Sequence, residues 1–174
     1  MDAATPFRMA RYKMRQKLIS LGEDFTIEDA SGHPAFEVDG KVMTLRETFE
    51  LKDLHGNVVA TIRGKLLPIR SKMEIFRNGD PVATVTKAFF TPFRDKFTVD
   101  VAGGEDLTID GSILDHEYTV RRDSEVVAQV SKRWFTLTDT YGIDVAAGED
   151  DALMLAIAVA LDEMAEEKEK EKET

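Results

Sequence analysis

The apolar residues of the chain are densest near the C-terminus, where the run from Ala152 to Leu161 contains no polar side chain. On a helix its large side chains point in every direction rather than along one stripe, so the helix must be buried on all sides or lie in lipid. Ten residues span about 15 Å as a helix, and a membrane crossing needs roughly twenty residues. The pattern therefore predicts a helix enclosed by the rest of the chain.

Upstream of this run, apolar and polar residues alternate with a period of two, which is typical of β-strands. Similar units begin at Phe25, Phe49, Met73, Phe97 and Tyr118, so successive starts are separated by 24, 24, 24 and 21 residues. Each unit contains two short apolar runs joined by turn residues. A fixed period of this kind predicts one β-hairpin per repeat.

Two further segments extend the series of strands. The stretch Arg11–Gln16 alternates charged and larger uncharged residues and predicts a strand at the start of the sheet. A sixth unit is expected from Phe135 to Val145, with its turn at residues 140–142. Asn78-Gly79 has the backbone preference of a tight primed turn, which supports the hairpin interpretation.

Together these segments predict about twelve mostly antiparallel strands. An open sheet of that size would leave two edges to protect, and closure into a barrel removes both. A barrel with more than about eight strands leaves an interior that its own side chains do not fill. We therefore expect a mainly β fold, a closed antiparallel barrel of about twelve strands around a central apolar C-terminal α-helix.

The charge of the chain is concentrated at its end. The formal net charge is -10. Residues 1–80 contribute 13 basic and 12 acidic side chains (+1), residues 81–148 contribute 7 and 11 (-4), and residues 149–174 contribute 3 and 10 (-7). We expect a flexible N-terminus over residues 1–10, a single barrel domain over 11–165 and a charged flexible tail over 166–174.

Composition also narrows the function classes. A nucleic-acid-binding domain is usually basic, so we expect no nucleic-acid partner. The chain has no cysteine, which fits a reducing cytoplasm and excludes disulfides and thiolate metal sites. The N-terminus lacks the apolar run of a signal peptide, and no stretch predicts a transmembrane segment. We expect a cytoplasmic protein, peripheral to a membrane if it contacts one.

Several blocks of the sequence resemble a known family. These are RYKMRQKLISLGEDFTI, GKLLPIRSKMEIFR, DKFTVDV, DHEYTV, VSKRWFTLTDTYGIDV and the final helix. They are similar to the LURP-one-related proteins, which have a tubby C-terminal-like fold, and more distantly to the phospholipid scramblases. The resemblance covers about residues 9–164. One departure is the turn at residues 121–125, which lacks the Asn-Gly often found in such units.

The resemblance implies a closed barrel of about twelve strands around an apolar C-terminal helix, in agreement with the residue pattern. It implies less about function, because the family is largely uncharacterised biochemically, with some plant members linked to defence against pathogens. Tubby proteins bind phosphoinositide headgroups through basic side chains on the barrel exterior. No motif here matches that site residue by residue, so its residues are not carried over.

The histidines are the first candidates for catalysis. His33 and His55 lie beside glycines in predicted turns, where polar turn residues are the simpler interpretation. His116, between Asp115 and Glu117, has the chemistry of a general base or metal ligand. Adjacent residues on a strand point to opposite faces, so we expect His116 to have a structural or solvated role instead.

The other candidates for chemistry are equally weak. The serines lack the G-x-S-x-G pattern of a nucleophile elbow. Gly103-Gly104 is not followed by Lys-Ser/Thr, so it predicts a turn and not a phosphate loop. Glu149, Asp150 and Asp151 lie where a helix begins, a position that favours capping and negative charge over metal binding. We expect no enzyme activity, no cofactor and no metal.

Basic side chains beside aromatic residues are the best candidates for a binding site. The cations chosen as candidate ligands for anionic lipid are Arg63, Lys65, Arg70, Lys72, Arg94 and Lys96, near Phe89, Phe90 and Phe93. A second basic-aromatic group runs from Lys132 to Phe135. Such groups suit an anionic membrane surface, where each cation contributes about 1 kcal/mol. In the alternative, the cations only solvate outer strand faces while the aromatic side chains fill the barrel.

The sequence thus predicts a non-catalytic binding or scaffold protein, with peripheral binding to anionic phospholipid or phosphoinositide as the first hypothesis. The alternative is a protein–protein interaction module without lipid binding, working through the barrel exterior or the acidic tail. The two differ in whether the candidate cations share one exposed surface.

Overall fold

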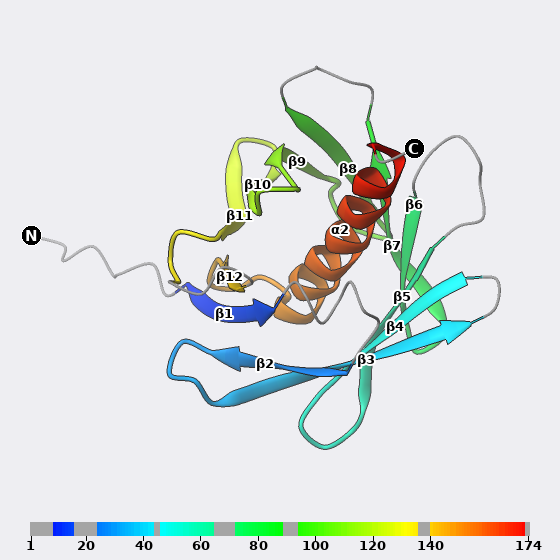
Figure 1. The fold of residues 1–174 in the computed structure, drawn as a ribbon, viewed down its shortest axis with the longest axis vertical. Helices are drawn as coiled ribbons and strands as arrows, with labels where there is room; N and C mark the ends of the chain where they lie inside the picture. Colours follow the sequence, from blue (N-terminus) through cyan, green and yellow to red (C-terminus); the bar gives the residue numbers. More distant parts are fainter. Residues whose placement is uncertain are drawn as a thin grey trace, which may run out of the picture.

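The protein is described by a computed structural model, which defines residues 9–15, 24–43, 46–64, 72–88, 94–135 and 140–172. Twelve antiparallel strands close into a barrel, and one helix passes through it (Figure 1). The strands are β1 (Ala10–Arg15), β2 (Phe25–Asp29), β3 (Pro34–Met43), β4 (Arg46–Lys52), β5 (Val58–Gly64), β6 (Lys72–Arg77), β7 (Asp80–Lys87), β8 (Asp95–Val101), β9 (Leu107–Ser112), β10 (Glu117–Arg122), β11 (Glu125–Ser131) and β12 (Thr140–Val145). The helix α2 spans Asp151–Lys172.

Each strand pairs with its neighbours in the sequence, and β1 pairs with β12 to close the ring. The closing pair is extensive, with six register partners from Ala10 opposite Val145 to Arg15 opposite Thr140. This confirms the predicted mainly β barrel of twelve strands.

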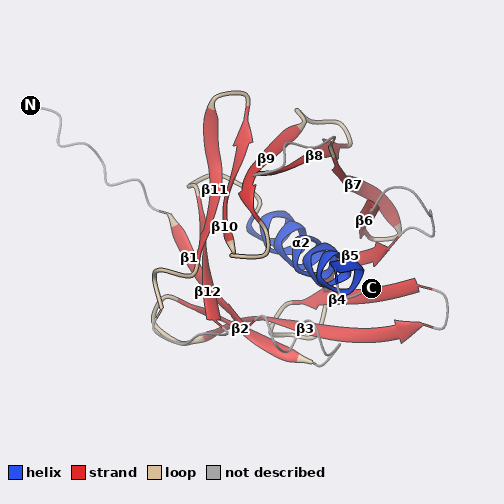
Figure 2. Ribbon diagram, turned by 45° about the horizontal axis from the view of Figure 1, so that its top comes forward, coloured by secondary structure: helices blue, strands red, loops and turns tan. Residues whose placement is uncertain are grey.

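The barrel has two distinct ends. At one end, which we call the turn end, β2, β4, β6, β8 and β10 turn back tightly, and β12 leads into α2. At the other, the loop end, β1, β3, β5, β7, β9 and β11 finish. The helix enters at the turn end and runs toward the loop end, as Figure 2 shows by looking through the ring of strands.

The tight turns explain the repeat seen in the sequence. Asn78 and Gly79 both have positive φ, of 52° and 83°, as a primed hairpin turn requires. In the β10–β11 turn, where Asn-Gly is missing, Asp123 takes the left-handed conformation with φ of 53°. Short polar side chains tolerate this conformation, so the departure from the family pattern leaves the hairpin intact.

The core lies between the inner strand faces and the helix. Leu155, Ile157, Val159 and Leu161 are all at most 1% exposed, as the apolar run predicted. Alternate strand residues such as Ile62, Ile75 and Phe97 complete the core from the barrel wall. A helix without a polar face is stable here because strands surround it on every side.

One predicted element was wrong. The sixth unit was expected to be a hairpin with its turn at residues 140–142, but these residues lie inside β12. Tyr141 and Gly142 pair there with Met14 and Lys13 of β1. Closure of the barrel requires a strand at this position, and that pairing with a distant segment outweighs the local turn preference of Gly142.

Candidate functional site

The candidate cations for anionic lipid lie on neighbouring strands where the structure describes them. Arg63 is near the end of β5, Lys72 begins β6, and Lys96 is in the first half of β8. The residues beside them, Ile62 and Met73, are buried, so the cations point outward by strand alternation. Lys65 and Arg70 lie outside the described residues.

These cations share the loop end of the barrel. Lys72 is opposite Thr86 on β7, which in turn is opposite Thr98 on β8, two residues from Lys96. Arg63, Arg94 and Lys96 are exposed, and Lys72 is half-buried. The four described cations therefore occupy one outer region, spread over β5, β6 and the start of β8.

Part of this positive charge is already paired. The Arg94 Nε lies 3.0 Å from Asp110 Oδ1, and Lys96 is the register partner of the same aspartate. The Arg63 guanidinium carbon lies 5.0 Å from the centroid of the Phe76 ring, a cation–π contact. The region is thus basic with an aromatic neighbour, but its charge is partly neutralised.

The second basic-aromatic group lies on the opposite wall, over β12. An added Cβ at Gly142 would be 2.6 Å from the Trp134 ring and 2.8 Å from the Phe135 ring, so both aromatics cover this glycine. Arg11 lies 4.3 Å from the centroid of Trp134, and Lys13 lies 5.8 Å from that of Phe135. The alternative interpretation, in which the aromatics fill the barrel, is therefore wrong for Trp134 and Phe135, because the glycine gives them room outside it.

Arg11 also ties the N-terminal strand to β12. Its Nε and Nη2 donate to Asp144 at 2.7 Å and 2.9 Å, and this carboxylate raises the pKa of the guanidinium. Lys13 lies 3.4 Å from Glu28 of β2. Arg11 and Lys13 of β1 therefore form ion pairs with the two neighbouring strands, β12 and β2, at the closure of the barrel.

His116 is the residue whose position the sequence analysis did not foresee. It is fully buried, with positive φ of 51°, and its Nε2 lies 2.8 Å from Asp162 Oδ1 on α2. The Tyr141 hydroxyl donates to the other oxygen of the same carboxylate. Burial, reinforced by the charge of Asp162, raises the pKa values of Tyr141 and Tyr118 well above 10.0.

This buried cluster has the residue types of an acid–base site but not the access. His116, Tyr141 and Asp162 are at most 7% exposed, and they bridge the β9–β10 connection, β12 and α2. A solvent-excluded contact between three elements holds the helix in place. The one sequence signal was Asp162 itself, the first charge after the apolar run, at a helix position that the barrel still encloses.

The other histidines lie where the sequence predicted. His33 and His55 are exposed in turns. The backbone N–H groups of both donate to an aspartate at the start of the turn, Asp29 and Asp53. Hydrogen bonds within the turns lower the pKa values of both carboxyl groups. The main bond to Asp29 comes from the His33 backbone, and the main bond to Asp53 comes from the Asn57 side chain. Their role is to shape the turns.

The acidic residues at the helix start are held by the turn end of the barrel. Arg122 donates to both oxygens of Glu149, at 2.8 Å and 2.9 Å, which lowers the pKa of that carboxyl. Arg77 pairs with Asp150 at 2.8 Å. Burial is the largest single influence on Asp150 and raises the pKa of its carboxyl, but the Arg77 bond and charge together with the backbone N–H groups of Leu153 and Ala152 outweigh it and lower the pKa.

Asp150 also caps the helix, since its Oδ1 accepts the Leu153 N–H at 3.1 Å. The Tyr12 hydroxyl donates to the next carboxylate, Asp151. The capping interpretation of the acidic group is therefore correct, with arginines and a tyrosine added. Within the described residues, no group of three His, Asp or Glu side chains is arranged to hold a metal ion.

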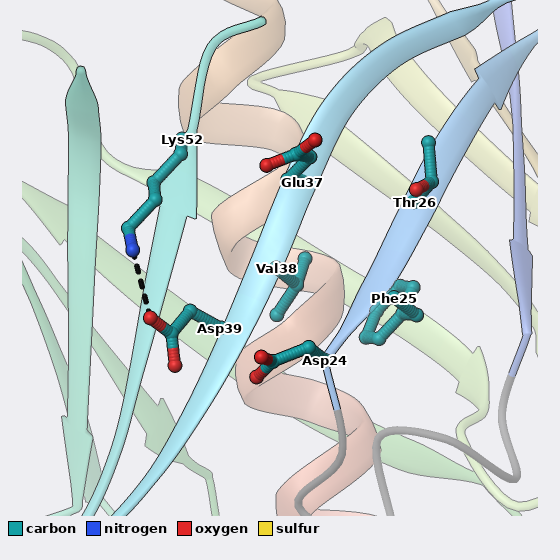
Figure 3. Close-up of a pocket in the computed structure, with 7 residues that line it drawn as sticks. All are labelled: Asp24, Phe25, Thr26, Glu37, Val38, Asp39 and Lys52. Atoms are coloured by element: carbon teal, nitrogen blue, oxygen red, sulfur yellow. Dashed lines mark hydrogen bonds and ion pairs between the residues drawn. The ribbon is translucent and has the colours of Figure 1, made fainter. Parts of the chain in front are cut away.

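A hollow of about 280 Å³ lies over β2, β3 and β4 (Figure 3). It is lined by Asp24, Phe25, Thr26, Glu37, Val38, Asp39 and Lys52. Lys52, its cation, is bound to Asp39 at 2.7 Å. Three carboxylates around one neutralised lysine disfavour an anionic ligand, so this hollow is not the lipid site predicted from the sequence.

None of the helices in the described part of the chain is both long and apolar enough to cross a membrane.

Comparison with known proteins agrees with this geometry. A family model described as LURP-one-related matches residues 10–162. The uncharacterised protein YxjI of Bacillus subtilis (strain 168) is 30% identical over 149 residues, which is 86% of this chain and 90% of that protein. An X-ray structure of an Arabidopsis thaliana protein has a TM-score of 0.67 at 22% identity, covering 91% of this chain and 92% of that one. The likeness to the Arabidopsis structure concerns the fold alone.

Proposed function

The chain belongs to the LURP-one-related family, and from that premise we propose that it is a non-catalytic binding module that attaches peripherally to anionic phospholipid. The observation that carries the proposal is the placement of Arg63, Lys72 and Lys96 on the outer face of β5, β6 and β8 at one end of the barrel. If these cations were instead distributed around the whole barrel, this observation would not support lipid binding. Lys65 and Arg70, in the connection between β5 and β6, belong to the proposed site by their position in the sequence.

The chemistry of the region supports an anionic surface better than a single small anion. The cations are spread over three strands and do not converge on a pocket, so they match a plane of headgroups. Phosphate groups attract cations without the fixed geometry that a catalytic site needs. The only histidine cluster with acid–base chemistry is shielded inside the barrel in the described structure, which supports a non-catalytic role.

Co-sedimentation with vesicles tests the proposal. We expect binding to phosphatidylcholine vesicles that contain phosphatidylserine or phosphoinositide, weaker binding at physiological salt, and no binding to phosphatidylcholine alone. The double variant Lys72→Glu/Lys96→Glu is expected to lose most of this binding. Arg121→Glu, which replaces an exposed arginine near the turn end of β10 and changes the net charge by half as much, is the control. Equal binding of all three proteins would contradict the proposal.

A second candidate function is protein binding through the turn end. Leu54 and Val58, both in the β4–β5 hairpin, are large apolar side chains that are 54% and 42% exposed, and exposed apolar surface of this kind can be covered by a protein partner. Substitution of both by Ser leaves the core intact. Cross-linking is compared for the natural protein and this variant. Loss of a cross-linked protein partner from the variant, with vesicle binding unchanged, would favour a protein-binding function for the turn end.

A further inference from the structure

The charged side chains of the barrel are sorted along its axis. Exposed carboxylates gather at the turn end, in and beside three of the tight turns: Asp80, Asp100, Glu105, Asp106, Asp123 and Glu125. Exposed cations gather at the loop end: Arg15, Arg63, Arg94, Lys96 and Arg133. The strands between them are five to ten residues long, so the two groups are separated by about 20 Å.

The cations at the turn end do little to offset this asymmetry. Arg121 is exposed there, but Arg122 and Arg77 are bound to Glu149 and Asp150 of the helix start. At the loop end, Asp110 pairs with Arg94, and Glu117 lies 3.9 Å from Arg133. Asp24 and Asp115 are also exposed at the loop end, and the charged C-terminal part of α2, with its glutamates and lysines, lies on that side. The loop end is therefore mixed, although its exposed cations outnumber these two exposed carboxylates, whereas the turn end carries a clear excess of negative charge.

This sorting matters because the chain carries a net charge of -10 and an anionic membrane would repel it on average. Repulsion weakens with distance and is screened over about 8 Å at physiological salt. A barrel standing with its loop end on the surface keeps the carboxylates of the turn end beyond that distance. A barrel lying on its side would bring some of them to the lipid.

We infer that the protein docks end-on, with the loop end of the barrel against the anionic membrane and the turn end facing away. This inference rests on the proposed function and specifies its orientation. Arg15 on β1 lies across the ring from Lys72 on β6 and Lys96 on β8, and Arg133, next to β11, lies between Arg15 and Lys96 around the ring. An end-on pose lets all four cations contact one flat surface. The contact then extends beyond the lipid ligands predicted from the sequence.

The absence of cysteine from the sequence makes the orientation directly measurable. Asp115→Cys places a thiol in the β9–β10 connection at the loop end, and Ser124→Cys places one in the β10–β11 turn, so both positions flank the same strand. Both residues are exposed. Each variant is labelled with an environment-sensitive nitrobenzoxadiazole group and titrated with vesicles containing phosphatidylserine.

We expect the label at position 115 to brighten and shift to the blue on binding, while the label at position 124 stays unchanged. In parallel, Arg133→Glu is expected to weaken co-sedimentation about fivefold or more, and Arg121→Glu, with the same change in charge at the turn end, to weaken it less.

The outcomes separate the two proposals. Co-sedimentation with an unchanged label at position 115, or with a response at position 124, overturns the end-on orientation and leaves lipid binding standing. Equal effects of Arg133→Glu and Arg121→Glu also overturn the orientation. Absence of co-sedimentation for the natural sequence overturns the proposed function, and the orientation with it.

Discussion

His116 and Asp162 meet inside the barrel, with 2.8 Å between the imidazole Nε2 and the carboxylate Oδ1. The histidine comes from the β9–β10 connection and the aspartate from α2, 46 residues later. The helix before Asp162, from Ala152 to Leu161, is apolar on all sides and has no polar stripe to set its rotation. The contact therefore gives a specific register to a helix that hydrophobic burial alone would hold less precisely.

Removal of this carboxylate is expected to destabilise the protein. In Asp162→Ala, the buried His116 ring and Tyr141 hydroxyl lose their shared acceptor, which costs about 2–4 kcal/mol of unfolding free energy in urea. Asp162→Asn keeps an acceptor for Tyr141 and should lose less. A stability of Asp162→Ala equal to that of the natural protein would show that the cluster contributes nothing to folding.

The fold was predictable because its signals are repeated and local. The alternation around Phe49, Met73 and Phe97 places each strand, and the all-apolar run around Ile157 requires an enclosure. The His116–Asp162 contact was not predictable, because nothing in the spacing of the two residues indicates that a turn and a helix meet. It depends on the axial position of the helix, which is set only when the barrel closes.

The same limit applies to the candidate site. The sequence identified Lys72 and Lys96 but not their relation to Arg133, which depends on the circular order of the strands. It also left open whether Trp134 and Phe135 lie on the surface or fill the barrel, because alternation cannot show which residues fold back over an outer glycine. Side-chain placement outside regular strands is therefore where sequence reasoning stopped.

The centre of the helix gives a test of the enclosed-helix fold. Ile157 is 1% exposed, and Ile157→Asp would bury an unpaired charge among apolar side chains. We expect a loss of several kcal/mol or failure to fold, measured by circular dichroism during thermal unfolding. Ile157→Val should fold and lose only about 1 kcal/mol. A cooperatively folded Ile157→Asp protein of normal stability is incompatible with this position of the helix.

Gly142 gives a test of the outer aromatic wall. In Gly142→Ala the new Cβ would be 2.6 Å from Trp134, so the indole must move outward into water. Trp134 is the one tryptophan in the sequence, and its emission should shift to the red with stronger quenching by acrylamide.

Gly64→Ala is the matched control for Gly142→Ala. It is also a strand glycine, and its Cβ would meet only the Met73 sulfur at an ordinary 3.6 Å. The Trp134 emission of this control should stay unchanged. Identical spectra for Gly142→Ala and the natural protein would mean that Trp134 does not cover this strand.

The ion pair between Arg122 and Glu149 makes stability depend on acid. The two hydrogen bonds from Arg122 lower the pKa of Glu149 below its ordinary value of 4.5, so in the range between the two values the unfolded chain binds more protons. The ion pair stabilises the protein fully when the pH is above the unfolded-state pKa of Glu149. This stabilisation is lost as the pH falls through the lower pKa that Glu149 has in the folded protein. Arg122→Met should therefore lower the unfolding free energy by roughly 1 kcal/mol at pH 7. The difference from the natural protein should shrink as the pH falls below 4.5 and Glu149 becomes protonated in the folded protein.

The neighbouring Arg121→Met is the control for this pH dependence, because its guanidinium reaches only the Ser124 carbonyl oxygen, at 3.4 Å. Urea unfolding at a series of pH values should give nearly parallel curves for Arg121→Met and the natural protein. The Arg122→Met curve should converge with them only in acid, since protonation of Glu149 removes the charge that Arg122 stabilises. A gap that stays constant from pH 7 into the acid range where Glu149 is protonated would mean that Arg122 acts through packing of its side chain and not through the carboxylate.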